Sequence, residues 1–401
     1  MLPIEVLKEI TVKTPAKIVL LVIDGVGGLP VGGKTELEAA HKPHLDELAR
    51  RSICGLTDPV YPGVTPGSGP GHLGLFGYDP LKYGIGRGVL EALGIGMELG
   101  AGDLVARGNY ATADPKGIIV DRRAGRIPTE KNKELCELLQ REIPEIEGIR
   151  VEIRPGKEHR FVVRFIGEGL DARIEDTDPQ KEGRHPRPVT PTHPDAFRTA
   201  EVVRAFLVKA HRVLKDYHPA NAILLRGFSQ LPALPSMGEI FKLTPACIAT
   251  YPMYKGLARL VGMEVLEAGS TIEEEFAALR ENYDRFDFFY LHVKQTDSFG
   301  EDGNFWGKVK VIEELDQYIP QLLELAPEVI TVTGDHSTPA LLRGHSWHPN
   351  PFILYSPNER TDDVDRFTEA ACAKGALGRF PAVAAMTLML AAALKMEKFG
   401  A

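Results

Sequence analysis

The sequence predicts an α/β fold in which helices flank a mostly parallel sheet, with an α+β domain inserted into it. Short apolar runs that end near an acidic side chain are typical of strands buried on both faces of a parallel sheet, and such runs span residues 17–23, 286–293 and 328–333. Segments with the 3.6-residue period of helices alternate with them. They span residues 43–51, 199–217, 271–283, 308–325 and 381–396, and this alternation is typical of α/β layers.

The character of the chain changes in its second quarter. Residues 150–154 and 160–164 alternate apolar and charged side chains, as half-buried strands do, and the polar, proline-bearing stretch 176–194 follows them. We therefore predict that residues 1–105 and 192–401 form the α/β core. Residues 106–191 are predicted to form the inserted α+β domain.

The composition is that of an ordinary globular protein. The 401 residues carry 47 basic and 55 acidic side chains, a net charge of -8, which argues against nucleic acid as a partner because phosphate binding needs a concentrated basic face. The four cysteines form no CxxC pair and are predicted to be reduced. The N-terminus lacks the apolar stretch of a signal peptide, and the apolar run 382–394 is too short to cross a bilayer. We expect a cytoplasmic protein without a membrane partner.

Asp24 follows the first predicted strand in the motif VIDGVGG. A carboxylate at a strand end beside glycines suits either a metal ligand or a dinucleotide site. The dinucleotide fingerprint GxGxxG fails, because Pro30 occupies the position of its last glycine. Taken alone, Asp24 is better explained as an ordinary turn residue.

Ser68 lies in the segment TPGSGPGHLGLFGYDP, within a glycine-rich stretch from Gly55 to Gly108. Glycine permits unusual dihedrals and close backbone approach, although a loop-rich surface is an alternative explanation. The apolar residues from His72 to Phe76 are predicted to begin a helix whose N-terminus favours an anion beside the serine. This arrangement suits phosphorylation of Ser68, and the segment is not a GxSxG nucleophile elbow.

Oxygen and imidazole ligands follow the second and third predicted strands. They are Asp297, Glu301, Asp335, His336 and His345. Since ligands gather beyond the carboxyl ends of strands in open α/β sheets, these side chains and Asp24 can converge. A set without thiolates favours manganese, magnesium or zinc in a hydrolytic or phosphoryl-transfer site. Two cations about 3.5 to 4 Å apart would lower the pKa of a bound hydroxyl, which makes Ser68 the predicted nucleophile.

The order of these residues resembles that in the alkaline phosphatase superfamily. More narrowly, four motifs resemble the archaeal-type cofactor-independent phosphoglycerate mutases. These are PGSGPGHLGLFGYDP at 66–80, NY-x(10)-DRRAGR at 109–126, YPMYKGLARLVGM at 251–263 and TGDHSTP at 333–339. The resemblance covers essentially the whole chain.

The resemblance implies an alkaline-phosphatase-like core with a two-metal site and an inserted domain that closes over the substrate. One cation would be held by Asp297, Glu301 and His345, and the other by Asp24, Ser68, Asp335 and His336. Mn²⁺ is the first expectation, with Mg²⁺, Zn²⁺ or Co²⁺ as alternatives, and no 2,3-bisphosphoglycerate is required. A homo-oligomer is left open.

The implied activity is that of an isomerase of glycolysis and gluconeogenesis, which interconverts 3-phosphoglycerate and 2-phosphoglycerate. Ser68 would accept the phosphoryl group and return it to the other hydroxyl of the enclosed glycerate. Lys255 matches a basic residue expected to face that group. Arginine binds carboxylate and phosphate bidentately, and the residues expected to bind the substrate are Arg107, Asn109, Asp121, Arg122, Arg123 and Arg126.

Several alternatives stay open. The family commonly has histidine where this chain has Glu301, so a changed metal preference or a non-catalytic relative is one alternative, although glutamate is also a hard ligand. A phosphomonoester hydrolase or a phosphopentomutase-like relative would use the same core with another cap. His72 is either a neighbour of the ligands or a core residue, His348 is expected behind the ligands, and Asp121 either binds the glycerate or orients the arginines.

Overall fold

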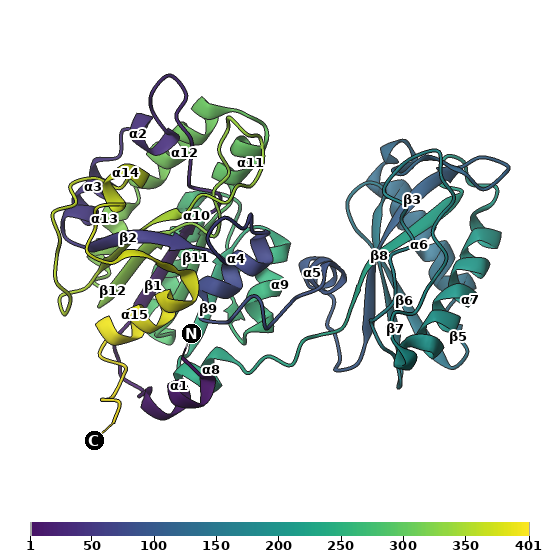
Figure 1. Cartoon of the computed structure of the whole chain (residues 1–401), viewed down its shortest axis with the longest axis horizontal. Helices are drawn as coiled ribbons and strands as arrows, with labels where there is room; N and C mark the ends of the chain where they lie inside the picture. Colours follow the sequence, from purple (N-terminus) through teal and green to yellow (C-terminus); the bar gives the residue numbers. More distant parts are fainter. Residues whose placement is uncertain (1, 401) are drawn as a thin grey trace. The chain divides into compact units, whose positions relative to one another are not determined.

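The computed structural model describes residues 2–400. The chain divides into two compact units (Figure 1). The first comprises the residues up to Gly84 together with those from Leu234 onward, and the second is Ile85–Ala233.

The first unit is built on an 8-stranded sheet. Its strands, in spatial order, are β10 (Glu264–Val265), β9 (Pro245–Ala249), β11 (Phe288–Val293), β1 (Ile18–Ile23), β12 (Val329–Thr333), β13 (Asn350–Tyr355), β2 (Ile53–Asp58) and β14 (Gly378–Pro381). β13 runs antiparallel to β12 and β2, and the other neighbouring strands pair in parallel. The predicted α/β class with a mostly parallel sheet is therefore confirmed.

Helices cover both faces of this sheet. One face buries Leu21 of β1 and its apolar neighbours against α3, α10, α12 and α13. On the other face, Tyr290 and His292 of β11 contact aromatic rings of α4 and α9. The helices of the first unit are α1 (Ile4–Ile10), α2 (Glu36–Ala39), α3 (Pro43–Arg50), α4 (Ser68–Leu75), α8 (Met237–Phe241), α9 (Pro252–Leu260), α10 (Ile272–Asn282), α11 (Gln295–Glu301), α12 (Phe305–Asp316), α13 (Ile319–Glu324), α14 (Glu369–Cys372) and α15 (Ala385–Ala392).

Two of the predicted helices differ from those observed. The segment 308–325 was predicted as one helix, but α12 ends at Asp316 and α13 begins at Ile319. Pro320 explains the break, because proline lacks the N–H that a helix interior needs and fits the first turn of a new helix. The predicted helix 381–396 is α-helical only in α15, and Leu394 beyond its end has a φ of 53°.

The second unit has a 6-stranded antiparallel sheet. Its strands are β3 (Leu104–Ala113), β4 (Ile119–Asp121), β5 (Glu145–Ile146), β6 (Ile149–Pro155), β7 (Arg160–Ile166) and β8 (Ala222–Ser229), and its helices are α5 (Arg87–Gly94), α6 (Thr129–Glu142) and α7 (Phe197–Leu214). α6 and α7 cover one face, where their apolar side chains pack against Tyr110, Phe161 and Phe165.

The second unit is larger than the predicted insertion of residues 106–191. β8 lies beyond that range, yet it pairs with β3 along most of its length. α7 was predicted to belong to the core, but it packs on the second unit's sheet through Val203 and Phe206. The boundaries at residues 106 and 191 are therefore corrected to 85 and 233, because local sequence patterns do not reveal which distant strand a segment pairs with.

No helix in residues 2–400 combines the length and the apolar character needed to span a membrane. The four cysteines are buried and are not joined in disulfides.

Glu275 of α10 makes the stability of the first unit depend on pH. Its side chain is fully buried, and neither carboxylate oxygen has a hydrogen-bond partner within the described residues. Burial raises the pKa of this carboxyl from 4.5 to about 8. The folded state therefore keeps a proton that the unfolded state loses, so stability falls as pH rises between these two values, by at most about 1.4 kcal/mol per pH unit.

We predict that Glu275→Gln raises the free energy of unfolding near pH 8 far more than near pH 5, because glutamine is a neutral isostere of the protonated side chain. Urea denaturation at the two pH values measures the effect, and Glu273→Gln, at an exposed position on the same helix, is the control. An equal change at both pH values would contradict the prediction.

Candidate metal centre

Three adjacent strands of the first unit bring the predicted acids together. Asp24 directly follows β1, Asp297 lies in α11 just after β11, and Asp335 comes shortly after β12. β1 lies between β11 and β12 in the sheet, with all three strands parallel. Their carboxyl ends therefore meet at one edge, where ligands gather in such folds.

The first group of ligand atoms comes from Asp24, Asp335 and His336, which are all fully buried. His336 Nε2 lies 3.4 Å from Asp24 Oδ1 and 3.1 Å from Asp335 Oδ2, and both oxygens lack a hydrogen-bond partner within the described residues. Ser68 Oγ lies 3.3 Å from the same nitrogen. Buried, unpartnered carboxylate oxygens are costly unless a cation or a donor satisfies them, so this group fits a divalent cation.

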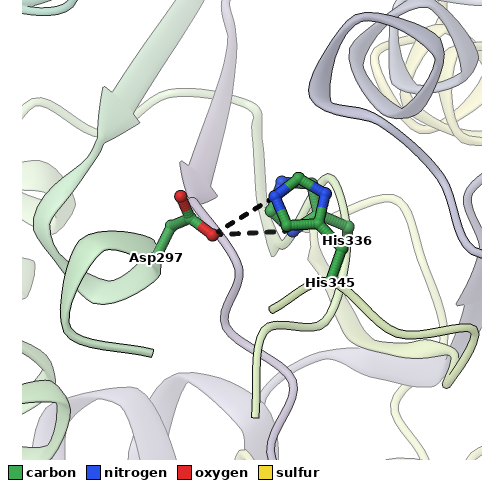
Figure 2. A group of neighbouring side chains, drawn as sticks. All are labelled: Asp297, His336 and His345. Carbon is green, nitrogen blue, oxygen red and sulfur yellow. Dashed lines mark ion pairs between the residues drawn. The ribbon is translucent and has the colours of Figure 1, made fainter. Parts of the chain in front are cut away.

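The second group comprises Asp297, His336 and His345. Figure 2 shows Asp297 facing the two imidazole rings, and its Oδ1 lies 3.6 Å from His345 Nε2. His345 Nδ1 lies 3.0 Å from the carbonyl oxygen of Pro66, which assigns the proton to Nδ1 and leaves the Nε2 lone pair facing Asp297. Glu301 Oε1 lies 3.9 Å from His345 Nε2, but Glu301 is 56% exposed and belongs to neither group of the described residues.

Thr338 fixes the orientation of His336. Its hydroxyl donates to Asp297 Oδ1 at 2.6 Å and lies 2.9 Å from His336 Nδ1. The hydroxyl has only one proton to donate, so His336 Nδ1 must be the donor to it. This assigns the Nε2 lone pair of His336 to the space between Asp24 and Asp335. Thr338 lies in the TGDHSTP motif, but the sequence alone did not single it out.

Ser68 is the first residue of α4, with Gly67 as the N-cap. The helix thus begins at the serine itself, earlier than His72, where it was predicted to start. A Cβ on Gly71 would lie 2.2 Å from the carbonyl oxygen of Asp335, so only glycine permits α4 to approach the ligand loop this closely. Close backbone approach therefore explains part of the glycine-rich stretch.

His72 of α4 supports both the serine and a candidate ligand. Its Nδ1 lies 2.8 Å from the carbonyl oxygen of Ser68 and 3.2 Å from Asp335 Oδ2. The ring is fully buried among Tyr254, Tyr290 and His292, and it belongs to neither ligand group of the described residues. The structure thus places His72 behind the ligands.

Three residues that the sequence did not single out surround the second oxygen of Asp24. Tyr254 donates its hydroxyl to Asp24 Oδ2 at 2.5 Å, His292 Nε2 lies 3.3 Å away and Lys294 Nζ lies 3.2 Å away. Burial alone would raise the pKa of Asp24, but His292, His336 and Lys294 outweigh it and hold that pKa well below its usual range. Lys294 and His292 stand in the run HVKQTD before Asp297, where unusual polar residues at a buried strand end were the available signal.

The charge of the carboxylates also affects Asp335. Burial and the neighbouring Asp24 raise the pKa of Asp335 to about 6, against the opposing effect of His72. Burial lowers the pKa of His336 well below its usual range, which favours the neutral imidazole that a metal ligand requires. The site therefore combines closely packed acids with neutral imidazoles.

A buried lysine holds the loops that carry these ligands. Lys308 of α12 is fully buried, and its Nζ donates to the carbonyl oxygens of Gly25 at 2.8 Å, Gly27 at 3.1 Å and Thr338 at 2.9 Å. One ammonium thereby joins the turn after Asp24 to the loop after His336. No sequence pattern indicated this role, because Lys308 occurs in an otherwise ordinary helical pattern.

The second unit presents a cationic face on the side of its sheet opposite α6 and α7, where Glu91 of α5 lies 3.8 Å from Arg107. Arg107 of β3 is the direct partner of Arg226 of β8, and Asn109 is the direct partner of Arg160 of β7. Paired residues in antiparallel strands point to the same side of a sheet. Burial lowers the pKa of Arg107 to about 10, against the opposing effect of Glu91, and the like charges of Arg160, Arg87 and Arg226 contribute to the lowering.

Polar atoms on this face remain available for a ligand. Arg107 Nε, Asn109 Oδ1 and Arg160 Nε are buried and have no hydrogen-bond partner within the described residues. Neither Arg160 nor Arg226 was among the predicted site residues. Arg160 begins the predicted strand 160–164, whose alternation was a usable signal, whereas no strand was predicted around Arg226. The N–H groups of Arg107 and Arg160 suit an anion, whereas Asn109 Oδ1 is an acceptor and suits a hydroxyl donor.

The remaining predicted residues of the second unit take different positions. Arg122 forms a two-point ion pair with the buried Asp178, at 2.9 and 2.6 Å. Asp121 accepts hydrogen bonds from the backbone N–H groups of Arg123 at 2.7 Å and Gly125 at 2.5 Å, so it shapes the turn that carries the arginines. Arg123 and Arg126 are exposed. In the first unit, Lys255 is half-buried on α9, and its proposed role stays a prediction.

The fold and the site place the chain among α/β proteins with a candidate centre for divalent cations. A sequence model described as 2,3-bisphosphoglycerate-independent phosphoglycerate mutase matches residues 49–221. A protein of Thermosipho africanus named as a probable enzyme of this kind is 54% identical over 398 residues, which cover 99% of each chain. A protein of Aquifex aeolicus with the same name is 54% identical over 407 residues, covering 99% of this chain and 100% of the relative.

Two solved structures share the architecture. A protein from Pyrococcus horikoshii superposes with a TM-score of 0.82 and 30% identity, covering 96% of this chain and 99% of the other. The cofactor-independent phosphoglycerate mutase from Thermoplasma acidophilum has a TM-score of 0.77 and 34% identity, covering 94% and 100%. The chain therefore belongs to the 2,3-bisphosphoglycerate-independent phosphoglycerate mutase family, as the motifs predicted. Membership implies an isomerase with a small phosphoglycerate substrate.

We predict that Thr338→Val weakens Mn²⁺ binding by about 10- to 100-fold, because His336 loses the partner that fixes its ring and Asp297 loses a donor. Isothermal titration without substrate measures the affinity. Thr338→Ser keeps the hydroxyl and is the matched control. Wild-type affinity in the valine variant would show that the hydroxyl does not orient the ligands.

Proposed function

We propose that this protein interconverts 3-phosphoglycerate and 2-phosphoglycerate, a step of glycolysis and gluconeogenesis, through a phosphoserine at Ser68 and with the help of two divalent cations. The observation that carries the proposal is the position of the Ser68 hydroxyl, 3.3 Å from His336 Nε2 at the first ligand group. A nucleophile for phosphoryl transfer must lie beside the groups that offset the charge on the phosphoryl oxygens.

Ser68 can accept a phosphoryl group at a favourable position. It begins α4, where the helix dipole and the first N–H groups favour an anion. In the first half of the reaction, Ser68 Oγ bonds to phosphorus, the bond from phosphorus to the 3-oxygen of glycerate breaks, and the proton that the serine loses is balanced by the one that the 3-oxygen gains. In the second half, the 2-hydroxyl takes the phosphoryl group and the serine regains its proton.

The two cations would be held by separate sets of ligands. Asp24, Ser68, Asp335 and His336 would hold one, and Asp297, Glu301 and His345 the other. When bound, the cations lower the pKa of the serine hydroxyl and offset the phosphoryl charge. We take Mn²⁺ first because of the family resemblance, with Mg²⁺, Zn²⁺ or Co²⁺ as alternatives that carboxylate and imidazole ligands also accept.

A mutase must also retain the glycerate between the two half-reactions and keep water out, since water would hydrolyse the phosphoserine. We assign the retention to the cationic face of the second unit, where arginine forks suit the carboxylate of the substrate. The residues assigned are Arg107, Asn109, Arg122, Arg123, Arg126, Arg160 and Arg226. Lys255 is assigned to the phosphoryl group. No 2,3-bisphosphoglycerate enters this scheme, and a cytoplasmic location and a homo-oligomer stay predictions.

Incubation of the protein with 3-phosphoglycerate and Mn²⁺, followed by phosphorus NMR, tests the proposal. We expect 2-phosphoglycerate to form without release of inorganic phosphate. Phosphate without the isomer would instead identify a phosphomonoester hydrolase, and no conversion with any of the four cations would favour a non-catalytic relative.

We predict that Ser68→Ala lowers kcat by at least about 1,000-fold and abolishes the phosphoenzyme, because no other hydroxyl replaces the nucleophile. Intact mass spectrometry detects the phosphate adduct, and circular dichroism reports the fold. Ser270→Ala, at an exposed position, is the control. Rapid mutase activity in Ser68→Ala would remove the serine from the mechanism.

We predict that Arg226→Ala raises KM for 3-phosphoglycerate by about 10- to 100-fold, as expected for the loss of a charged hydrogen-bonding group. Steady-state kinetics measures the change. Arg141→Ala removes an exposed arginine of α6 and should leave KM unaltered. An unchanged KM in Arg226→Ala would exclude that arginine from substrate binding.

A further inference from the structure

One ammonium contacts both ligand groups of the candidate centre. Lys294 lies at the end of β11, immediately before α11. Its Nζ lies 3.2 Å from Asp24 Oδ2 and also forms an ion pair and a hydrogen bond with Asp297 Oδ2. The side chain is 18% exposed. Asp24 belongs to the first ligand group and Asp297 to the second, so this lysine joins the two.

The two aspartates divide their oxygens in the same way. Asp24 turns Oδ1 toward His336 and Oδ2 toward Lys294, at 3.4 and 3.2 Å. Asp297 turns Oδ1 toward His345 at 3.6 Å and its Oδ2 toward the same lysine. In both residues, one oxygen thus faces the imidazole ligands and the other faces the ammonium.

This division argues against a lysine that merely fills the place of a cation. An ammonium in that role would bond to the oxygens that face the imidazoles. Asp24 Oδ1 instead remains without a hydrogen-bond partner within the described residues, while Lys294 contacts the opposite oxygen. The rings of Tyr251 and Tyr254 lie 5.8 Å from Nζ and help to hold it there.

We infer that Lys294 is a positioning residue that links the two metal sites through the outer oxygens of Asp24 and Asp297. This inference rests on the proposed two-cation function. A carboxylate can bind a cation with one oxygen or two and can rotate about its bond to the chain. Lys294 engages Oδ2 of both aspartates, and Tyr254 also donates to Oδ2 of Asp24. Each aspartate then offers Oδ1 to a cation, and the shared ammonium keeps the two inner oxygens at a fixed separation.

Lysine suits this task because its ammonium carries three donors around one nitrogen. Two of them can serve two carboxylates that follow different strands, Asp24 after β1 and Asp297 in α11 after β11. Partners that hold metal ligands from behind commonly contribute 10- to 100-fold to metal affinity, roughly the effect expected here. The alternative is that Lys294 only neutralises the acids, in which case its removal would strengthen cation binding by relieving repulsion.

The experiment measures Mn²⁺ binding to the full-length wild-type protein and to Lys294→Met by isothermal titration, without substrate. We expect two bound ions in the wild type and an affinity about 10- to 100-fold weaker in the variant. The stabilisation that Mn²⁺ confers against thermal unfolding should fall accordingly. Lys310→Met, which removes an exposed lysine of α12, should behave as the wild type.

Lys294→Arg provides a second variant. Arginine keeps the positive charge and has enough N–H donors for both carboxylates, so this variant should recover part of the lost Mn²⁺ affinity. Affinity in Lys294→Met that equals or exceeds that of the wild type would overturn the inference. Failure of the proposed function has a different signature, because a wild type that binds two ions yet forms no 2-phosphoglycerate would refute the mutase without altering the comparison between variants.

Discussion

The closeness of three buried carboxylates at one edge of a parallel sheet is the constraint on which the first unit depends. Asp24, Asp297 and Asp335 carry like charges where little water screens them, an arrangement that is unfavourable without compensating charge. The imidazoles, the Lys294 ammonium and the Tyr254 hydroxyl offset part of this charge. Within the described residues, oxygens without a hydrogen-bond partner remain in the first ligand group. The unsatisfied carboxylate oxygens of Asp24 and Asp335 therefore lie where divalent cations would fit.

The surrounding hydrogen bonds act mainly on the orientation of the ligands. Thr338 and the carbonyl of Pro66 each fix one imidazole, while Lys308 ties the turn after Asp24 to the loop after His336. These contacts come from segments far apart in the chain. They show why a site made of a few side chains requires the whole sheet and several helices to define it.

The sequence predicted the strands and the acidic residues better than the side chains that hold those acids in position. Apolar runs ending at Asp24 and near Asp335 revealed both the buried strands and the ligands, because burial and chemistry leave signals at adjacent positions. Lys308 escaped notice because its partners are carbonyl groups of distant segments that no local pattern contains. Lys294 was overlooked although it stands at a buried strand end, three residues before Asp297. The predicted extent of the second unit was too small because β8 pairs with β3, a strand more than 100 residues earlier in the chain.

Gly71 lets α4, which begins at Ser68, pack directly against the main chain of Asp335. The carbonyl of Asp335 occupies the space that a side chain at this position would need, so even a methyl group would force α4 outward and take Ser68 with it. The position of Ser68 is therefore set by the lack of a side chain at Gly71. Apolar cores accept many substitutions that keep their volume, whereas a larger residue at position 71 would collide with the main chain.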